Sequence, residues 1–467
     1  MEVGKMSNQG LHTKETKALY RNVFNQEIET MPTEKMRALQ EEKFLKQVEY
    51  SYKNSTFYQR KFKEAGIELE DIRSLDDIKK IPMTTKQELR DALLQQPPIL
   101  GENQTATSEK IVRLHASSGS TGRPTYVGLT KTDTLLWDES CARAFWTNGI
   151  RPDDVVAHCW NYSMFVGGLA DHMGCEHTGA TMVPIGIGNS GRLARMIQDL
   201  GITAINATPS YIMYLADAIK KELGIDPAET TLKKIITGGE PGGAIPATRK
   251  LIEETWNAKC CELYGMVDIH PIIGAECEHQ QGMHFLVGDL VYPELFDVET
   301  GEHLEIKAGA VGEVVYTHLE RYANSVLRFK SHDIIEVLGT ECECGRTGYR
   351  FKVVGRSDDM LIVKGVNVYP SAIEDVLRDI EEMTGHFAIK LEKEGVQQDF
   401  IQLVAEFAAD YKGDLEILNK KVQNRIGDML QFRANVELVA ENSLPRFEHK
   451  AKRIYKTYQG EHLPINQ

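Results

Sequence analysis

Residues 117–125 read SSGSTGRPT, a run of small hydroxylated residues interrupted by glycines. Glycine adopts backbone conformations that other residues avoid, and the neighbouring hydroxyl groups supply hydrogen-bond donors. A loop of this composition can wrap a polyphosphate with its own backbone. It lacks the GK[ST] ending of the Walker P-loop, so a kinase or GTPase of that type is not implied. An ordinary turn is the alternative interpretation.

A second set of residues has the chemistry of a metal site. Cys342 and Cys344 form a C-x-C pair, and Cys277 lies upstream in a segment that ends at His284. Thiolates with an imidazole suit tetrahedral Zn²⁺. His279 is the rival nitrogen ligand, and His284 is preferred because its longer loop folds around an ion more easily. Free, reduced thiols are the alternative.

The remaining cysteines do not suggest a site. Cys260 and Cys261 are adjacent and point to opposite faces of an extended strand, which makes them poor joint ligands. Cys141, Cys159 and Cys175 are predicted to be core residues. Eight cysteines in 467 residues are too few for a disulfide scaffold.

Length and composition limit the function classes. A chain of 467 residues suggests about two to three domains, and 42% hydrophobic with 26% charged residues is ordinary for a globular enzyme. No run of eighteen apolar residues is present and the start lacks an apolar stretch, so we expect a cytoplasmic protein without a membrane partner. The formal charge of -14 argues against a nucleic-acid partner.

The elements that must position these residues follow an α/β rhythm. Residues 13–66 are predicted to form amphipathic helices. From about 110 to 260, short β-rich runs alternate with helical stretches, which predicts mostly parallel sheets with flanking helices and a ligand at the carboxyl ends of the strands. The clearest predicted strands are 155–160, 181–185, 203–207 and 233–239, and the clearest predicted helices are 190–200 and 210–223.

The pattern changes twice more along the chain. Residues 285–355 are rich in valine alternation and turns, which predicts a β-rich subdomain. After GRSDD at 355–359 the chain restarts as a small α+β unit, with a helix from about Ser371 and another near 413–431. We therefore expect a large N-terminal domain, 1–357, and a small mobile C-terminal domain, 358–467.

Four further motifs follow the glycine loop in order. They are YGMVD at 264–268, RFKSHD at 328–333, GRSDDMLIVKGVNVYP at 355–370 and RFEHKAKR at 446–453. This ordered set resembles the adenylate-forming enzymes, a group that includes acyl-CoA synthetases, firefly luciferase and peptide-synthetase adenylation domains. It is most similar to phenylacetate-CoA ligases, with ATPSY at 207–211, ETMP at 29–32 and PMTTK at 82–86 as further marks.

The resemblance implies a two-step reaction. A carboxylate, here an aryl acid such as phenylacetate, attacks the α-phosphate of ATP, and the thiol of coenzyme A then displaces AMP from the acyl-AMP. Two alternatives stay open: an adenylate-forming enzyme with another acceptor, a protein or a deazaflavin cofactor, and a nucleotide-binding regulatory protein without catalysis. The partners implied are a small carboxylic acid, ATP, Mg²⁺ and coenzyme A, with a homodimer as the expected assembly.

The resemblance also assigns the nucleotide contacts. Asp333 is implied to bind both ribose hydroxyls, with Arg356 beside it. Lys450 is implied to bridge the α-phosphate and the substrate carboxylate, a task that suits a point charge on a long flexible side chain. Arg123 adds a cation to the phosphate loop. The other implied contacts are, for the phosphates, Ser117, Ser118, Gly119, Ser120, Thr121 and Gly122, and, around adenine, Gly238, Gly239, Glu240, Pro241, Tyr264, Gly265 and Met266.

Two departures and a hinge complete the implied machinery. Asp268 stands where most relatives carry the glutamate that binds Mg²⁺, and its shorter stem must approach more closely or act through water. His449 replaces the glycine usual before the lysine. Asp358 matches the hinge position, and 364–368 match the segment that swings in for thioester formation.

The acyl pocket is assigned by position. Residues 158–168 and 207–211 match the segments that line the carboxylate's pocket in relatives, and two glycines, Gly167 and Gly168, leave room for a flat ring. Ordinary core packing is the alternative. The predicted walls are Tyr162, Phe165, Gly167, Ala207 and Tyr211. For the cysteine and histidine set, the resemblance implies a structural zinc that stabilises the β-rich subdomain.

Overall fold

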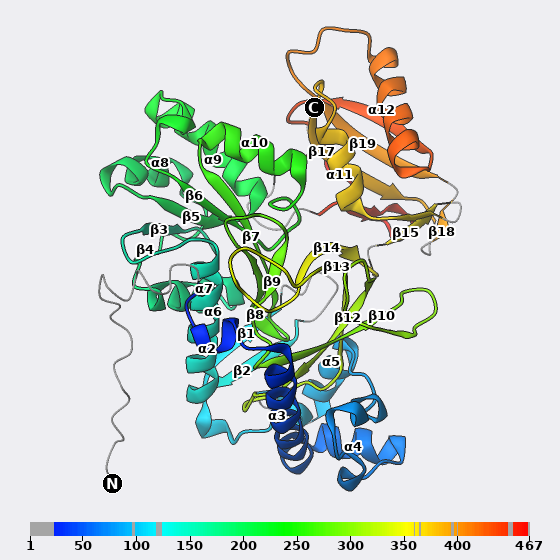
Figure 1. Ribbon diagram of the computed structural model, residues 1–467. Coiled ribbons are helices and arrows are strands. Elements are labelled where there is room, and N and C mark those ends of the chain that lie inside the picture. Colours follow the sequence, from blue (N-terminus) through cyan, green and yellow to red (C-terminus); the bar gives the residue numbers. More distant parts are fainter. Residues whose placement is uncertain are drawn as a thin grey trace.

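The protein folds into a large body followed by a smaller C-terminal unit, seen at the upper right of Figure 1 in this computed structural model. The structure describes residues 23–95, 99–117, 124–358, 360–363, 366–393, 397–398, 400–446 and 452–465. In that part of the chain no helix is long and apolar enough to cross a bilayer. The cytoplasmic location stays a prediction.

The body is built on one twelve-stranded sheet, in the order β11-β10-β12-β13-β14-β9-β8-β7-β6-β5-β3-β4. Strands β4, β3, β5, β6 and β7 run parallel, as the alternating pattern predicted. Their bounds are Val155–His158 for β3, Thr181–Val183 for β4, Ala204–Ala207 for β5, Lys234–Thr237 for β6 and Lys259–Met266 for β7.

Helices cover both faces of the parallel half, which gives three layers (Figure 1). On one face α8 (Ser190–Asp199), α9 (Pro209–Leu223) and α10 (Pro246–Trp256) bury side chains against β5 and β6, including Ile212 and Trp256. On the other face α6 (Lys131–Thr147) and α7 (Val166–His177) contribute Phe145 and Cys175. Burial of these apolar faces is the main force that holds the layers together.

The β-rich region continues the same sheet. Strand β7 pairs parallel with β6 on one edge and antiparallel with β8 on the other, so the sheet changes direction there. The sequence predicted this region as a subdomain, and the strand pairing shows that it shares the sheet of the α/β part. The antiparallel strands are β8 (His270–Glu276), β9 (Met283–Phe285), β10 (Val291–Phe296), β11 (His303–Leu304), β12 (Val311–His318), β13 (Phe329–Gly339) and β14 (Arg350–Arg356).

The N-terminal helices pack at the antiparallel end of the body, at the bottom of Figure 1. These are α3 (Thr33–Asn54), α4 (Thr56–Ala65) and α5 (Lys86–Gln95), with 3₁₀ turns such as Leu75–Lys80 between α4 and α5. The short α2 (Gln26–Glu29) precedes them and lies beside α6, where Asn25 Nδ2 donates to Glu139. Aromatic side chains of α3 and α4 form a cluster with Leu319 and Leu327 of the body. The predicted helices therefore belong to the body's core.

A separate hairpin carries the glycine loop. Strands β1 (Ile111–Ala116) and β2 (Tyr126–Thr130) pair antiparallel, with Ala116 opposite Tyr126. Thr130 then caps α6, because its side chain accepts a hydrogen bond from the Asp133 backbone while Asp133 binds back. The hairpin is thereby fixed to the start of a long buried helix.

The C-terminal unit has its own sheets and core. A four-stranded sheet, β20-β19-β17-β21, is covered by α11 (Pro370–Arg378) and α12 (Leu415–Leu430), close to the predicted helices. A smaller sheet has the order β16-β15-β18. The strands are β15 (Leu361–Val363), β16 (Val366–Val368), β17 (Met383–Leu391), β18 (Gln397–Gln398), β19 (Ile401–Phe407), β20 (Ala434–Ala440) and β21 (Ile454–Lys456).

Candidate active site

The two ends of the glycine loop are held together. The Ser117 backbone N–H donates to the Thr125 carbonyl at 3.0 Å, and the Thr125 N–H donates to Ser117 Oγ at 2.9 Å. Residues 118–123, with the predicted phosphate contacts Ser118, Gly119, Ser120, Thr121 and Gly122 and the added cation Arg123, lie outside the described residues. The loop therefore leaves and rejoins a fixed hairpin end.

The predicted magnesium carboxylate lies beside this hairpin end. Asp268 is buried in the turn between β7 and β8, and its Oδ1 accepts the Thr125 hydroxyl at 2.6 Å. Its Oδ2 accepts a hydrogen bond at 3.0 Å from the ammonium of Lys86, the first residue of α5. The structure thus joins the loop base to Asp268, and it adds Lys86, a residue of the PMTTK motif for which the sequence predicted no contact.

The predicted ribose residues form a connected set. Asp333 on β13 lies opposite Arg356 on β14, and Asp333 Oδ1 accepts a hydrogen bond from Arg356 Nη1 at 2.7 Å. Asp333 Oδ2 accepts the Tyr264 hydroxyl at 2.6 Å. The Tyr264 ring lies edge-on to Phe351, with centroids 5.6 Å apart. Burial, followed by the charge of Asp333, raises the pKa of Tyr264 well above its usual value, so the phenol stays a donor.

Arg356 also binds the predicted hinge. Its Nε and Nη2 each donate to one oxygen of Asp358 at 2.8 Å, which makes a two-pronged pair. Burial raises the pKa of Asp358, but the hydrogen bond and the charge of Arg356 outweigh it, so the net pKa is lowered. One guanidinium therefore joins the ribose aspartate to the hinge aspartate.

The predicted adenine loop is attached to the start of α9. Glu240 Oε1 accepts the Ser210 backbone N–H at 2.9 Å. Gly239 has a left-handed φ of +78°, and a side chain there would lie 2.7 Å from the Trp160 ring. Only glycine fits that backbone beside an indole. Pro241 is exposed beyond the turn. Gly265, which precedes Met266 on β7, lies so close to the Pro271 carbonyl that no side chain could replace its hydrogen.

The predicted acyl-pocket residues gather at the carboxyl ends of β3 and β5. Tyr211 is buried and its hydroxyl lies 3.0 Å from that of Ser190. The Tyr162 hydroxyl lies 2.8 Å from His172 Nδ1. Ala207 is fully buried at the end of β5, whereas Phe165 is 40% exposed at the start of α7.

A side chain missed from the sequence fills part of this region. The Trp160 ring lies 3.4 Å from where a side chain on Gly167 would begin, so the flat ring that Gly167 accommodates in this structure belongs to the chain itself. Glycine is required at 168 for a different reason, because a side chain there would collide with the Asn161 carbonyl. A role of either glycine toward a substrate stays a prediction. The signal in the sequence for the position of Trp160 was the glycine at 167, which leaves space for a neighbouring ring.

The cysteine and histidine set converges as the sequence predicted. The ligand atoms of Cys277, His284, Cys342 and Cys344 all lie within 4.8 Å of one another. The Cys277 and Cys342 sulfurs are 3.7 Å apart, and Cys344 Sγ lies 3.3 Å from His284 Nε2. His279 instead faces Glu343 at 3.8 Å.

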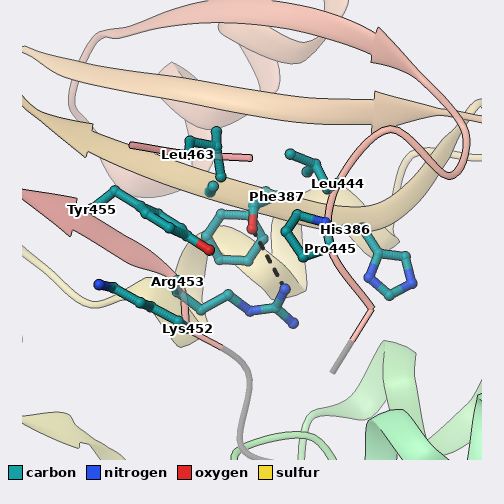
Figure 2. A pocket seen from close by; sticks show the side chains of 9 residues that line it. His386, Phe387, Leu444, Pro445, Lys452, Arg453, Tyr455 and Leu463 are labelled. Atoms are coloured by element: carbon teal, nitrogen blue, oxygen red, sulfur yellow. Dashed lines mark hydrogen bonds between the residues drawn. The ribbon is translucent and has the colours of Figure 1, made fainter. Parts of the chain in front are cut away.

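The predicted catalytic lysine, Lys450, and His449 lie outside the described residues, but both flanks of that segment are fixed. Arg446 pairs with the buried Glu406 at 2.7 Å, and Arg453 with the buried Glu374 at 3.1 Å. Figure 2 shows the pocket beside these flanks, with Arg453 reaching the Phe387 carbonyl. Its lining is His386, Phe387, Ala388, Leu444, Pro445, Lys452, Arg453, Tyr455 and Leu463.

Family models match the sequence over both parts of the structure. The model of the AMP-binding enzymes matches residues 33–318, and that of the AMP-binding enzyme C-terminal domain matches residues 365–457. The chain belongs to the AMP-binding enzyme family. This adenylate-forming ligase is 36% identical over 450 residues to a phenylacetate-coenzyme A ligase of Thermus thermophilus, covering 91% of this chain and 97% of the relative. It is 33% identical to that of Escherichia coli, covering 92% and 96%.

Among solved structures, the AMP-binding enzyme resembles a 2-hydroxyisobutyryl-CoA ligase. In the postadenylation state, with its acyl-AMP bound, that ligase superposes with a TM-score of 0.85 at 31% identity, covering 93% of each chain. With coenzyme A in the thioesterification state the TM-score is 0.70, at 30% identity over 96% and 94% of the chains. The present arrangement of body and C-terminal unit is therefore more similar to the postadenylation state.

Proposed function

We propose that this AMP-binding enzyme converts a carboxylic acid and ATP into acyl-AMP and pyrophosphate, and then transfers the acyl group to coenzyme A, releasing AMP. The observation that carries the proposal is that β7 connects the two groups: the loop base bonds to Asp268 just after β7, and the Asp333–Arg356 pair bonds to Tyr264 on β7. The named ligases that the chain resembles support the same reaction.

In the first step a carboxylate oxygen bonds to the α-phosphorus while the bond to pyrophosphate breaks. Both reactants are anions, so cations must offset their repulsion as charge develops. We assign Lys450 as the cation at the reacting end, and residues 117–122 as the hydrogen-bond donors that hold the leaving pyrophosphate. Asp333 and Arg356 hold the ribose side.

Magnesium fits the same region. Asp268 is a buried carboxylate whose present partners, the Thr125 hydroxyl and the Lys86 ammonium, are the kind of donor that a cation replaces. Bound there, the ion would neutralise charge on the phosphates. We propose Asp268 as its protein ligand.

In the second step the thiol of coenzyme A attacks the acyl carbon and AMP leaves. We propose that the chain divides at 358 into domains 1–357 and 358–467, and that the smaller one turns about Asp358 between the two steps. A higher TM-score to the postadenylation than to the thioesterification state of one related ligase supports a turn of this kind.

The acid is proposed to be an aryl acid such as phenylacetate. Relatives named for phenylacetate support this choice, as do the aromatic side chains at the ends of β3 and β5, namely Tyr162, Trp160 and Tyr211. An apolar, mostly preformed pocket with few polar groups suits such a ligand.

A structural zinc ion is proposed at the four-residue cluster. Tetrahedral coordination with zinc–sulfur bonds of about 2.3 Å separates two sulfurs by about 3.8 Å. The 3.7 Å between Cys277 and Cys342 fits that geometry. His284 Nδ1, buried and without a partner among the described residues, faces away from the cluster.

A homodimer is also proposed. Its support is an exposed apolar face on the β1–β2 hairpin, where Val112 and Leu114 are 58% and 40% exposed and Tyr126 is 37% exposed. Exposed apolar patches of this kind often mark protein interfaces.

The test of the reaction is a panel of carboxylic acids scored for AMP release with and without coenzyme A. We expect AMP release that requires an aryl acid, and an acyl-CoA product. Product only with another acceptor would favour a protein- or cofactor-adenylating enzyme. Absence of acid-dependent AMP release from wild type, with Lys450→Ala as the inactive reference, would contradict the proposal.

A further inference from the structure

The hinge aspartate is held by a residue of the body. Asp358 receives both Nε and Nη2 of Arg356 at 2.8 Å, while Nη1 of the same guanidinium donates to Asp333 at 2.7 Å. Asp333 is buried on β13 and fixed from its other oxygen by Tyr264. Arg356 therefore attaches residue 358 to the rigid sheet that carries the ribose site.

Two more contacts connect residues on either side of 358. Ser371, in the first turn of α11, donates its hydroxyl to the Val354 carbonyl on β14 at 2.9 Å. The Tyr369 ring lies over Gly355, where a side chain would begin only 2.5 Å from the ring. A turn of the C-terminal unit about 358 moves α11 relative to β14, so it must break the Ser371–Val354 bond.

We infer that Arg356 and Ser371 are positioning residues that latch the C-terminal unit in the adenylating orientation. The inference rests on the proposed hinge at Asp358. Its physical basis is that the two-pronged pair holds the turning point and the Ser371 bond spans it. Both are made in an arrangement more similar to a postadenylation state than to a thioesterification state. Contacts present in one orientation favour that orientation only.

The latch is weak because its ion pair is partly exposed to solvent. The Arg356 and Asp358 side chains are 32% and 44% exposed, and partly exposed ion pairs shift an equilibrium only modestly. A modest latch suits a step that has to be undone in every turnover. It also predicts that loss of either contact lowers the first half-reaction slightly and does not lower the second.

The test compares two variants that break the latch without fixing the hinge. Asp358→Asn removes the charge from the two-pronged pair, and Ser371→Ala removes the donor to Val354. We expect each to lower acid-dependent pyrophosphate exchange by roughly two- to fivefold. Thioester formation from supplied acyl-AMP and coenzyme A is expected to stay equal or rise.

Asp358→Pro serves as the opposite case. Proline fixes φ and also removes the carboxylate that Arg356 holds, so we expect pyrophosphate exchange to fall as far as in Asp358→Asn and thioester formation to fall much further. Glu382→Gln is the matched control, because it breaks an exposed pair with Lys421 inside the C-terminal unit, away from the hinge. It should change neither half-reaction.

A readout independent of activity is energy transfer between a dye on α9 and one on α12 in the ligand-free enzyme. Asp358→Asn and Ser371→Ala should both change the efficiency in the same direction, with thermal unfolding unchanged. If both variants leave dye distances and half-reactions as in wild type, or lower the two half-reactions equally, the latch is wrong. If Asp358→Pro fails to separate the half-reactions, the proposed hinge itself is wrong.

Discussion

Lys86 is the residue whose position adds most to the site. Its ammonium binds Asp268 from the start of α5, on an element 182 residues earlier in the chain. It is about one-third exposed, so it can exchange Asp268 for another anion. A cation on the phosphate side of the site would help to hold a triphosphate.

We predict that Lys86→Met raises the KM for ATP by about three- to tenfold, with a smaller effect on kcat. The reason is the loss of a positive charge beside the proposed phosphate and magnesium region. Initial rates over a matrix of ATP and Mg²⁺ concentrations measure the change. Lys46→Met, which breaks an exposed pair with Glu42, is the control. An unchanged KM for ATP at every Mg²⁺ concentration would contradict the role.

The sequence could predict some of these residues and not others. Asp333 and Arg356 lie 23 residues apart in two quoted motifs, and pairing of β13 with β14 places them opposite each other. Lys86 has no spacing that relates it to Asp268. Trp160 was not predictable for a similar reason, because its packing on Gly167 and Gly239 depends on how the loop after β3, the first turn of α7 and the loop after β6 meet.

At the scale of elements, the cysteine and histidine cluster joins parts of the chain that are far apart. Cys277 follows β8, His284 lies on β9, and Cys342 and Cys344 lie in the turn between β13 and β14. Beside it, Arg346 donates to the buried Glu29 of α2 at 2.7 Å. The cluster thus ties the turn to the sheet, next to the N-terminal helices.

We predict that Cys344→Ser removes one bound zinc ion per chain and lowers the melting temperature by roughly 5–15 °C. A cluster of buried ligands contributes to folding once the ion fills it. Elemental analysis of protein purified without chelators and thermal unfolding measure both effects. Cys260→Ser, at a buried cysteine outside the cluster, should keep the ion. Wild-type protein without metal would dispose of the zinc proposal.

The order of strands and helices was predictable because burial on both faces of a parallel sheet leaves short apolar runs between amphipathic helices. The strands at 155–158, 204–207 and 234–237 and the helices α8 and α9 follow that pattern. Continuity of the sheet across β7 was not predictable. It depends on which edge of β7 the hairpin to β8 occupies, and composition carries no signal of an edge.

At the scale of the whole molecule, four buried histidines make folding sensitive to acid. Burial, the largest cause in each, lowers the pKa of His115 and His158 to about 4 and of His270 and His318 to about 3. His318 uses both nitrogens, donating to the Ile269 carbonyl and accepting from the Val326 N–H. A second ring proton would face a donor.

We predict that the free energy of unfolding falls as pH drops from 7 to 5. Histidines of the unfolded chain bind protons near their ordinary pKa of about 6.5, whereas these four do not in the folded chain. Each of them therefore lowers the free energy of unfolding by about 1.4 kcal/mol for every pH unit below about 6.5, down to its folded pKa. Urea titrations at several pH values measure the slope. His318→Gln should reduce it. Stability that rises on acidification in this window would refute the prediction.

Strand β7 has a consequence for how such an enzyme can change. Because the sheet reverses direction there, the hairpin from β7 to β8 presents Asp268 at the rim where the parallel strands end. The carboxylate's place is set by topology and needs no inserted loop. The segments after β3 and β5, where the acid is proposed to bind, can therefore change in sequence while the position of the proposed metal ligand stays the same.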